Sequence, residues 1–117
     1  MSFKFEKLEI WKDAMVLGNE IDVLSSSFPR KEVYNLSSQI RRAADSIALN
    51  ISEGSILQSN PEQRRFMGYA IRSLAEVVTC LHKAKHRNYL DESNFSKSYA
   101  FCYRIMNSMI AYRKTLK

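Results

Sequence analysis

Apolar residues recur every three or four positions along most of the chain, which is the spacing of amphipathic helices. Four such stretches predict helices over about residues 7–27, 30–54, 60–88 and 92–116. The predicted core positions are Ile10, Ala14, Leu17, Ile21, Leu24 and Phe28 in the first helix, Leu36, Ile40, Ala43, Ala44, Ile47, Ile51 and Gly54 in the second, Phe66, Ala70, Leu74, Val77, Leu81 and Ala84 in the third, and Phe95, Tyr99, Cys102, Ile105, Met106 and Met109 in the fourth. The pattern predicts an all-α fold in which residues 1–117 form one domain.

Local signals predict where these helices begin and end. Pro29 suits the first turn of the second helix, because proline is tolerated there. Asn60, followed by proline and then Gln63, indicates an N-cap with a capping box. Asn88 can adopt the left-handed conformation that ends a helix, and Asp91 is a candidate cap for the last helix. Residues 54–59 form the predicted loop, with an exposed apolar pair at Ile56 and Leu57.

A row of polar residues runs beside the core positions of the second helix. Its members are Gln39, Arg42, Ser46, Asn50 and Glu53. Asn50 falls where heptad spacing predicts a core residue, and a polar residue there typically fixes helix register. We interpret the row as a network that braces helix packing or a subunit contact. The alternative is a catalytic or ligand-binding role for Asn50 and Glu53.

Three further positions of the first two helices bear on packing and assembly. Leu49 lies on an otherwise polar side of the second helix, which hints at oligomerisation. Trp11 either closes one end of the helix bundle or contacts another subunit. Gly54 is small, so a partner helix can approach closely at its level.

Composition narrows the class of protein. Hydrophobic residues make up 45% of the chain, and only three glycines and two prolines occur, so the chain has few of the turns that a β-sandwich needs. Cys80 and Cys102 show no metal-binding or redox spacing and are expected to be small apolar core residues in a reducing compartment. The N-terminus lacks the apolar block of a signal peptide, and we expect a cytoplasmic protein.

Charge is distributed unevenly. The net charge is +6, but residues 1–29 carry −2 whereas residues 60–117 carry +7. This asymmetry indicates either a polyanionic partner or contact between unlike faces of neighbouring subunits. The candidate nucleic-acid-binding residues are Arg64, Arg65, Arg72, Lys83, His86, Arg87 and Arg104, most of which fall opposite the core on the third helix. A plain solvated face or a surface for an acidic protein are the alternatives.

Other candidate chemistry is weak. Tyr69, Tyr103 and Tyr112 can stack on bases if they flank the basic stripe, although aromatic residues at helical spacing commonly belong to a core. His82 and His86 have a spacing that can chelate a metal ion, but no further histidine and no HExxH motif accompany them. Phosphate-binding loops and nucleophile motifs are also absent from the sequence, so we expect no metal, no cofactor and no enzymatic activity.

The chain resembles the bacterial family of 23S rRNA intervening-sequence proteins. The residues that carry the resemblance are Leu8, Trp11, Ala14, Phe28, Pro29, Glu32, Tyr34 and Leu36, the block from Gln39 to Gly54, and Ser59, Glu62, Phe66, Ala70, Ser73, Leu74 and Glu76. The resemblance implies an antiparallel up-down-up-down four-helix bundle that forms a homopentamer. It also implies a similarity to the accessory protein of diversity-generating retroelements, which binds nucleic acid and reverse transcriptase.

Two departures from the family pattern affect the expected function. Residues 55–58 replace an arginine expected after Gly54, which weakens the case for binding a polyanion, whereas Arg72 stands where a small residue is common and strengthens it. The first hypothesis is therefore a non-enzymatic oligomer that binds nucleic acid, RNA rather than DNA, through its third helix. The second is a protein-protein interaction scaffold whose charged faces bind neighbouring subunits or a protein partner.

Overall fold

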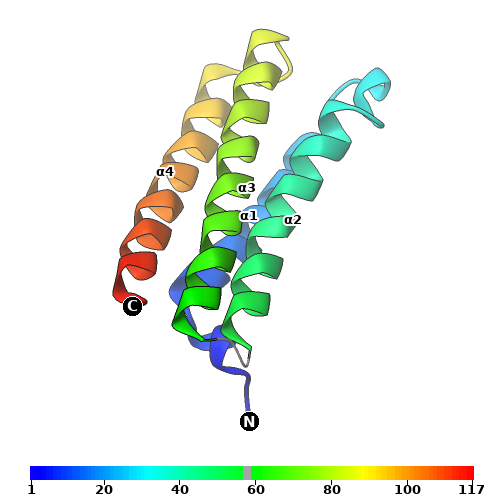
Figure 1. The fold of residues 1–117 in the computed structure, drawn as a ribbon. Helices are drawn as coiled ribbons and strands as arrows, with labels where there is room; N and C mark the ends of the chain where they lie inside the picture. Colours follow the sequence, from blue (N-terminus) through cyan, green and yellow to red (C-terminus); the bar gives the residue numbers. More distant parts are fainter. Residues whose placement is uncertain (57–58) are drawn as a thin grey trace.

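The computed structural model describes residues 1–56 and 59–117. The described chain contains the α-helices α1 (Glu9–Ser25), α2 (Leu36–Ser55), α3 (Asn60–His86) and α4 (Glu92–Thr115), with the short 3-10 helices η1 (Lys4–Lys7) and η2 (Arg30–Glu32) (Figure 1). No strand occurs within the described ranges. The all-α prediction is confirmed.

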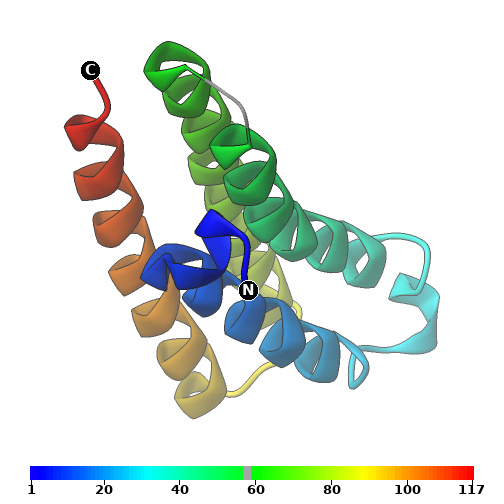
Figure 2. The same cartoon turned by 90° about the horizontal axis from the view of Figure 1, so that it is seen from below.

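The four helices form an antiparallel up-down-up-down bundle of about 43 × 24 × 23 Å. The α1–α2 and α3–α4 connections lie at one end, whereas both termini, the end of α2 and the start of α3 lie at the other (Figure 1). Each helix contacts its two neighbours around the bundle, and the contact between α1 and α4 closes the ring (Figure 2). The most extensive contact joins α2 to α3.

Most predicted core positions are buried, and they form one hydrophobic cluster between the four helices. The exceptions show where simple spacing fails. Leu24, Phe66 and Met106 are only half-buried, and Met67 takes the core position predicted for Phe66. Tyr99 was predicted to point inward, but 39% of its surface is exposed.

The ends of α3 and the start of α4 follow local rules with one shift. Asp91 accepts a hydrogen bond from the Asn94 amide at 2.7 Å, which confirms it as the cap of α4. Asn88 has a φ of 62°, the left-handed conformation predicted for it. The cap of α3 is Ser59 rather than the predicted Asn60.

The start of α2 and the loop before α3 also differ from prediction. The second helix was predicted to begin at residue 30, but η2 and a turn occupy residues 30–35 and α2 begins at Leu36. Pro29 precedes η2 in an extended conformation, with a ψ of 148°. In the predicted loop, Ile56 is exposed as expected, whereas Leu57 lies outside the described residues.

Candidate nucleic-acid interface

Four cationic or titratable side chains lie on one exposed face of α3, which we call the basic face. They are Arg65, Arg72, Lys83 and His86. Their separations of seven, eleven and three residues bring them back to the same side of the helix, and the face is about 32 Å long at 1.5 Å per residue. Among the described residues, Arg72, Lys83 and His86 form no ion pair, whereas Arg65 pairs with Glu62.

The other predicted binding residues are placed differently. Arg64 is exposed near the start of α3, and its carbonyl oxygen accepts a hydrogen bond from Nε of Arg113 on α4 at 3.0 Å. Arg87 forms an ion pair with Glu32 at 3.2 Å. Arg104 lies on α4, with its guanidinium carbon 4.9 Å from the centre of the Phe101 ring. The structure therefore does not bring Arg104 to the basic face.

An aromatic row follows α4 along its border with α3 and consists of Phe95, Tyr99 and Tyr103. The first two ring centres lie 5.7 Å apart and the second two lie 6.4 Å apart, with the planes inclined by 27° and 24°. Tyr99 and Tyr103 line a groove of about 240 Å³ together with Ala75 and Val78 of α3. Of the three tyrosines considered for base stacking, Tyr103 thus lies next to the helix that carries the basic face.

The other two candidate tyrosines have different surroundings. Tyr69 is partly exposed on α3, and the guanidinium carbon of Arg65 lies 5.9 Å from its ring centre, so Tyr69 also borders the basic face. Tyr112 is half-buried, and its hydroxyl accepts a hydrogen bond from Gln63 Nε2 at 3.0 Å. Gln63 therefore joins α3 to α4, which is a different role from the capping box predicted for it.

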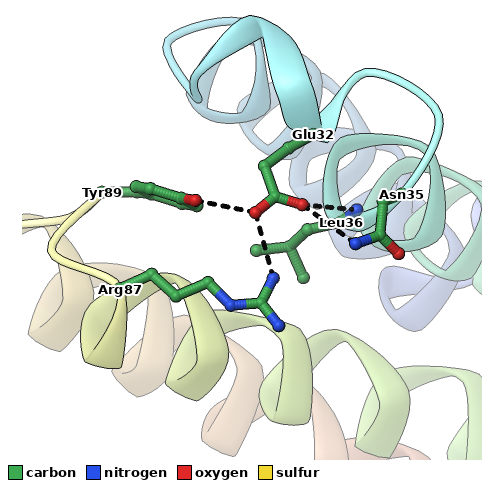
Figure 3. A network of polar contacts seen from close by, with 5 residues as sticks. All are labelled: Glu32, Asn35, Leu36, Arg87 and Tyr89. Atoms are coloured by element: carbon green, nitrogen blue, oxygen red, sulfur yellow. Dashed lines mark hydrogen bonds and ion pairs between the residues drawn. The ribbon is translucent and has the colours of Figure 1, made fainter.

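Glu32 is the centre of a polar network that the sequence did not predict (Figure 3). Only 4% of the residue is exposed. Its carboxylate accepts hydrogen bonds from the Tyr89 hydroxyl at 2.7 Å, Arg87 Nη1 at 3.2 Å, Asn35 Nδ2 at 3.1 Å and the Leu36 amide at 3.3 Å. The network joins the α1–α2 connection to the α3–α4 connection. It also satisfies one of the free amide groups at the start of α2.

The same contacts shift two pKa values in opposite directions. The hydrogen bond from Tyr89 lowers the pKa of the Glu32 carboxyl, and the Leu36 amide, Arg87 and Asn35 act in the same sense, against the opposing effect of burial. The hydrogen bond to Glu32 raises the pKa of the Tyr89 hydroxyl, with help from burial and from the carboxylate charge. Both shifts favour an ionised Glu32 and a neutral Tyr89.

Comparison with known proteins identifies the family. The chain matches the family described as 23S rRNA-intervening sequence protein over residues 6–111. The chain belongs to this family. A solved structure from Bacteroides thetaiotaomicron, described as a protein with unknown function from the S23 ribosomal protein family, has the same fold, with a TM-score of 0.83 and 19% sequence identity. The match covers 90% of this chain and 98% of that one. No curated protein matches the sequence significantly.

In this member of the 23S rRNA-intervening sequence protein family, part of the predicted polar row joins α2 to α3. Ser46 and Ser73 are hydrogen-bonded through their hydroxyls at 2.9 Å. Asn50 Nδ2 donates to the Ser46 carbonyl oxygen at 2.8 Å and to its hydroxyl at 2.9 Å. Arg42 and Glu53 are exposed, and Gln39 is half-buried. Ser46 thus links α2 to α3, and Asn50 supports the Ser46 hydroxyl from within α2.

Trp11 and Leu49, the two residues considered for subunit contacts, lie close together. Trp11 is half-buried and packs against Phe5 of the N-terminal segment, with ring centres 5.2 Å apart. Leu49 is 61% exposed. Both residues line a surface groove of about 400 Å³ between α1 and α2. Trp11 therefore covers one part of the bundle and still reaches an open surface.

The described residues of the family member contain no group of three potential metal-ligating side chains. His82 instead contacts aromatic rings, with its centre 5.0 Å from Phe95 and 6.0 Å from Tyr99. Cys80 and Cys102 are both buried and free. In the part of the chain that the structure describes, no helix is both long enough and apolar enough to cross a membrane.

Proposed function

We propose that this protein is a non-enzymatic, oligomeric nucleic-acid-binding protein of the bacterial cytoplasm that binds RNA through the basic face of α3. The observation that carries the proposal is the placement of Arg72, Lys83 and His86 along one exposed face without ion-pair partners among the described residues. The cations Arg72 and Lys83, with the imidazole of His86 beside them, can follow a phosphate backbone and release its condensed counterions. The preference for RNA over DNA is part of the proposal; the family's description mentions 23S rRNA but names no ligand.

The contacts of the cations separate binding candidates from structural ones. Arg87 is committed to the buried carboxylate of Glu32, and Arg104 lies beside Phe101. We therefore assign phosphate binding to the four residues of the basic face, with Arg64 at its margin. Two acids border the basic face. Glu62 is paired with Arg65, whereas Glu76 is exposed one helical turn after Arg72 and forms no ion pair among the described residues.

Assembly strengthens this proposal. The family resemblance implies a homopentamer, and a ring of five subunits repeats the basic face five times. Contacts at several copies convert later binding events into intramolecular ones, which raises the overall affinity without any new contact in one subunit.

The test is a double charge reversal on the basic face. The variant Arg72→Glu/Lys83→Glu is compared with Lys7→Glu/Lys97→Glu, which makes the same change of net charge at exposed positions of η1 and α4. Binding of a structured RNA is measured by fluorescence anisotropy at several salt concentrations. We expect the first variant to lose affinity and to reduce the slope of log K against log salt by about 0.7–0.9 per lost phosphate contact. Equal loss in both variants, or salt-independent binding by the wild type, contradicts the proposal.

A second function is favoured by a different surface. The groove that Trp11 and Leu49 line is apolar and open, and α1 carries acidic residues on the exposed side at Glu9 and Glu20. These features suit a protein-protein interaction scaffold. If the Arg72→Glu/Lys83→Glu variant loses its oligomeric mass in light scattering while RNA binding is weak in every variant, the scaffold explains the charge pattern better.

A further inference from the structure

The aromatic row of α4 lies directly beside the basic face of α3. Tyr99 and Tyr103 share a groove with Ala75, and Ala75 lies one helical turn after Arg72 on α3. The two helices run side by side in both views of the bundle (Figures 1 and 2). A ligand that contacts the exposed tyrosines can therefore also reach the cations of the basic face.

One further cation, Lys85, borders the other end of the row. The Lys85 ammonium nitrogen lies 4.5 Å from the centre of the Phe95 ring. His82 contacts both Phe95 and Tyr99 edge-on. The carboxylate that borders this end is Glu92, and it is paired with Lys85 at 2.7 Å. At this end the charge of Lys85 is balanced by Glu92, so the cations available to an anionic ligand are those of the basic face.

The row turns out of the core as it proceeds along α4. Its exposed fraction rises from 7% at Phe95 to 39% at Tyr99 and 62% at Tyr103. Four-residue spacing exceeds one helical turn by about 40°, so each ring is turned further from the core than the one before. Within the described residues, the hydroxyls of Tyr99 and Tyr103 make no hydrogen bond that would explain their position. Tyr99 stacks between Phe95 and Tyr103, and Tyr103, the most exposed ring of the row, borders the side of α3 that carries the basic face.

We propose that Tyr99 and Tyr103 form a stacking platform for unpaired bases, and that the preferred ligand is single-stranded RNA whose phosphates lie on the basic face. This inference rests on the proposed nucleic-acid-binding function and specifies its substrate class. Bases in a duplex are stacked on one another and hide their faces, whereas bases of a single strand can be splayed onto aromatic side chains. The cations attract either form, because both forms carry a phosphate backbone.

The experiment compares a single-stranded RNA oligonucleotide with a duplex that contains the same strand, by anisotropy at one fixed salt concentration. The variants are Tyr99→Ala and Tyr103→Ala. The matched control is Tyr34→Ala, which removes a tyrosine that is 97% exposed near the start of α2, and Tyr103→Phe preserves the stacking ring. We expect each alanine variant on the row to weaken single-strand binding about 5- to 150-fold. We expect little change in duplex binding, and both control variants should bind like the wild type.

The outcomes separate this inference from the proposed function. If the wild type binds the single strand and the duplex equally and the alanine variants match it, the stacking platform is wrong while the basic face stands. If the wild type binds neither RNA, the proposed function fails and the inference fails with it. Light scattering of the Tyr103→Ala variant tests whether the row is a subunit contact. A loss of oligomeric mass would show that it is one and would overturn the inference. Thermal unfolding checks that the variants remain folded.

Discussion

The close approach of α2 and α3 at Gly54 can be tested with one methyl group. Gly54 is buried in the last turn of α2. A Cβ atom placed there would lie 2.6 Å from Cβ of Phe66 and 3.5 Å from the carbonyl oxygen of Gln63. Cβ of Phe66 is bonded directly to the backbone, so a side-chain rotation cannot relieve this contact. The Gly54→Ala variant must therefore move α3 away from α2.

Two opposing effects set the size of the change. Overpacking a tight contact costs about 1–3 kcal/mol, whereas replacing glycine by alanine inside a helix gains about 1 kcal/mol at most. We expect Gly54→Ala to lower the free energy of unfolding by about 0.5–2 kcal/mol. Gly68→Ala is the matched control, because its Cβ would meet only Nε of Arg113 at 3.9 Å. That variant should be more stable than the wild type by about 0.5–1 kcal/mol.

Urea unfolding followed by far-ultraviolet circular dichroism measures both variants. Protein concentration is kept constant, since assembly couples stability to concentration, and an unchanged m-value shows that the midpoint reports stability. Replacing glycine by alanine should lower the free energy of unfolding at Gly54 and raise it at Gly68. A Gly54→Ala variant as stable as the wild type would refute the claim that the helices are in rigid contact there.

Two further predictions follow from pKa shifts. The lowered pKa of the Glu32 carboxyl means that its ionised form stabilises the fold above its ordinary pKa of 4.5, and this contribution is lost as pH falls through the folded-state pKa. In urea unfolding, the Glu32→Gln variant should therefore be less stable than the wild type at about pH 7. It should also lose less stability than the wild type on acidification to about pH 3. Equal losses in the variant and the wild type would contradict this prediction. Burial raises the pKa of the Cys80 thiol and raises that of the Cys102 thiol to about 12. Both thiols should therefore react slowly with a disulfide reagent at about pH 8 and rapidly in urea. Fast labelling of the native protein would show that the core opens.

Much of the fold could be predicted because its determinants are local. Helical spacing identified the buried faces, and Asp91 and Asn88 marked the boundary between α3 and α4 through their own backbone preferences. The small residue at Gly54 also indicated a close approach, and Phe66 of α3 is the neighbour that the structure places against it. These signals depend on a few adjacent residues, so no knowledge of the tertiary contacts is needed to recognise them.

The start of α2 could not be predicted in the same way. Glu32 accepts hydrogen bonds from Arg87 and Tyr89, which lie 55 and 57 residues further along the chain. Partners this distant produce no periodic pattern in the sequence near residue 32. Of the candidate interface, spacing predicted the exposed face of α3, but it could not distinguish Arg72 from Arg87, whose ion-pair partner comes from the distant η2. It also placed Tyr99 in the core, because the drift of four-residue spacing becomes visible only once the neighbouring helices are placed.

The basic face and the aromatic row make separable contributions to binding. Each phosphate contact of a cation changes the slope of log K against log salt, because it changes the number of released counterions. Stacking on an aromatic ring releases no counterion. Removal of Tyr103 should therefore lower log K by the same amount at every salt concentration and leave the slope unchanged. Removal of Arg72 should lower log K and also change the slope. A change of slope in the Tyr103→Ala variant would mean that the ring positions neighbouring cations, and the preference for single strands would then have to arise from the cations themselves.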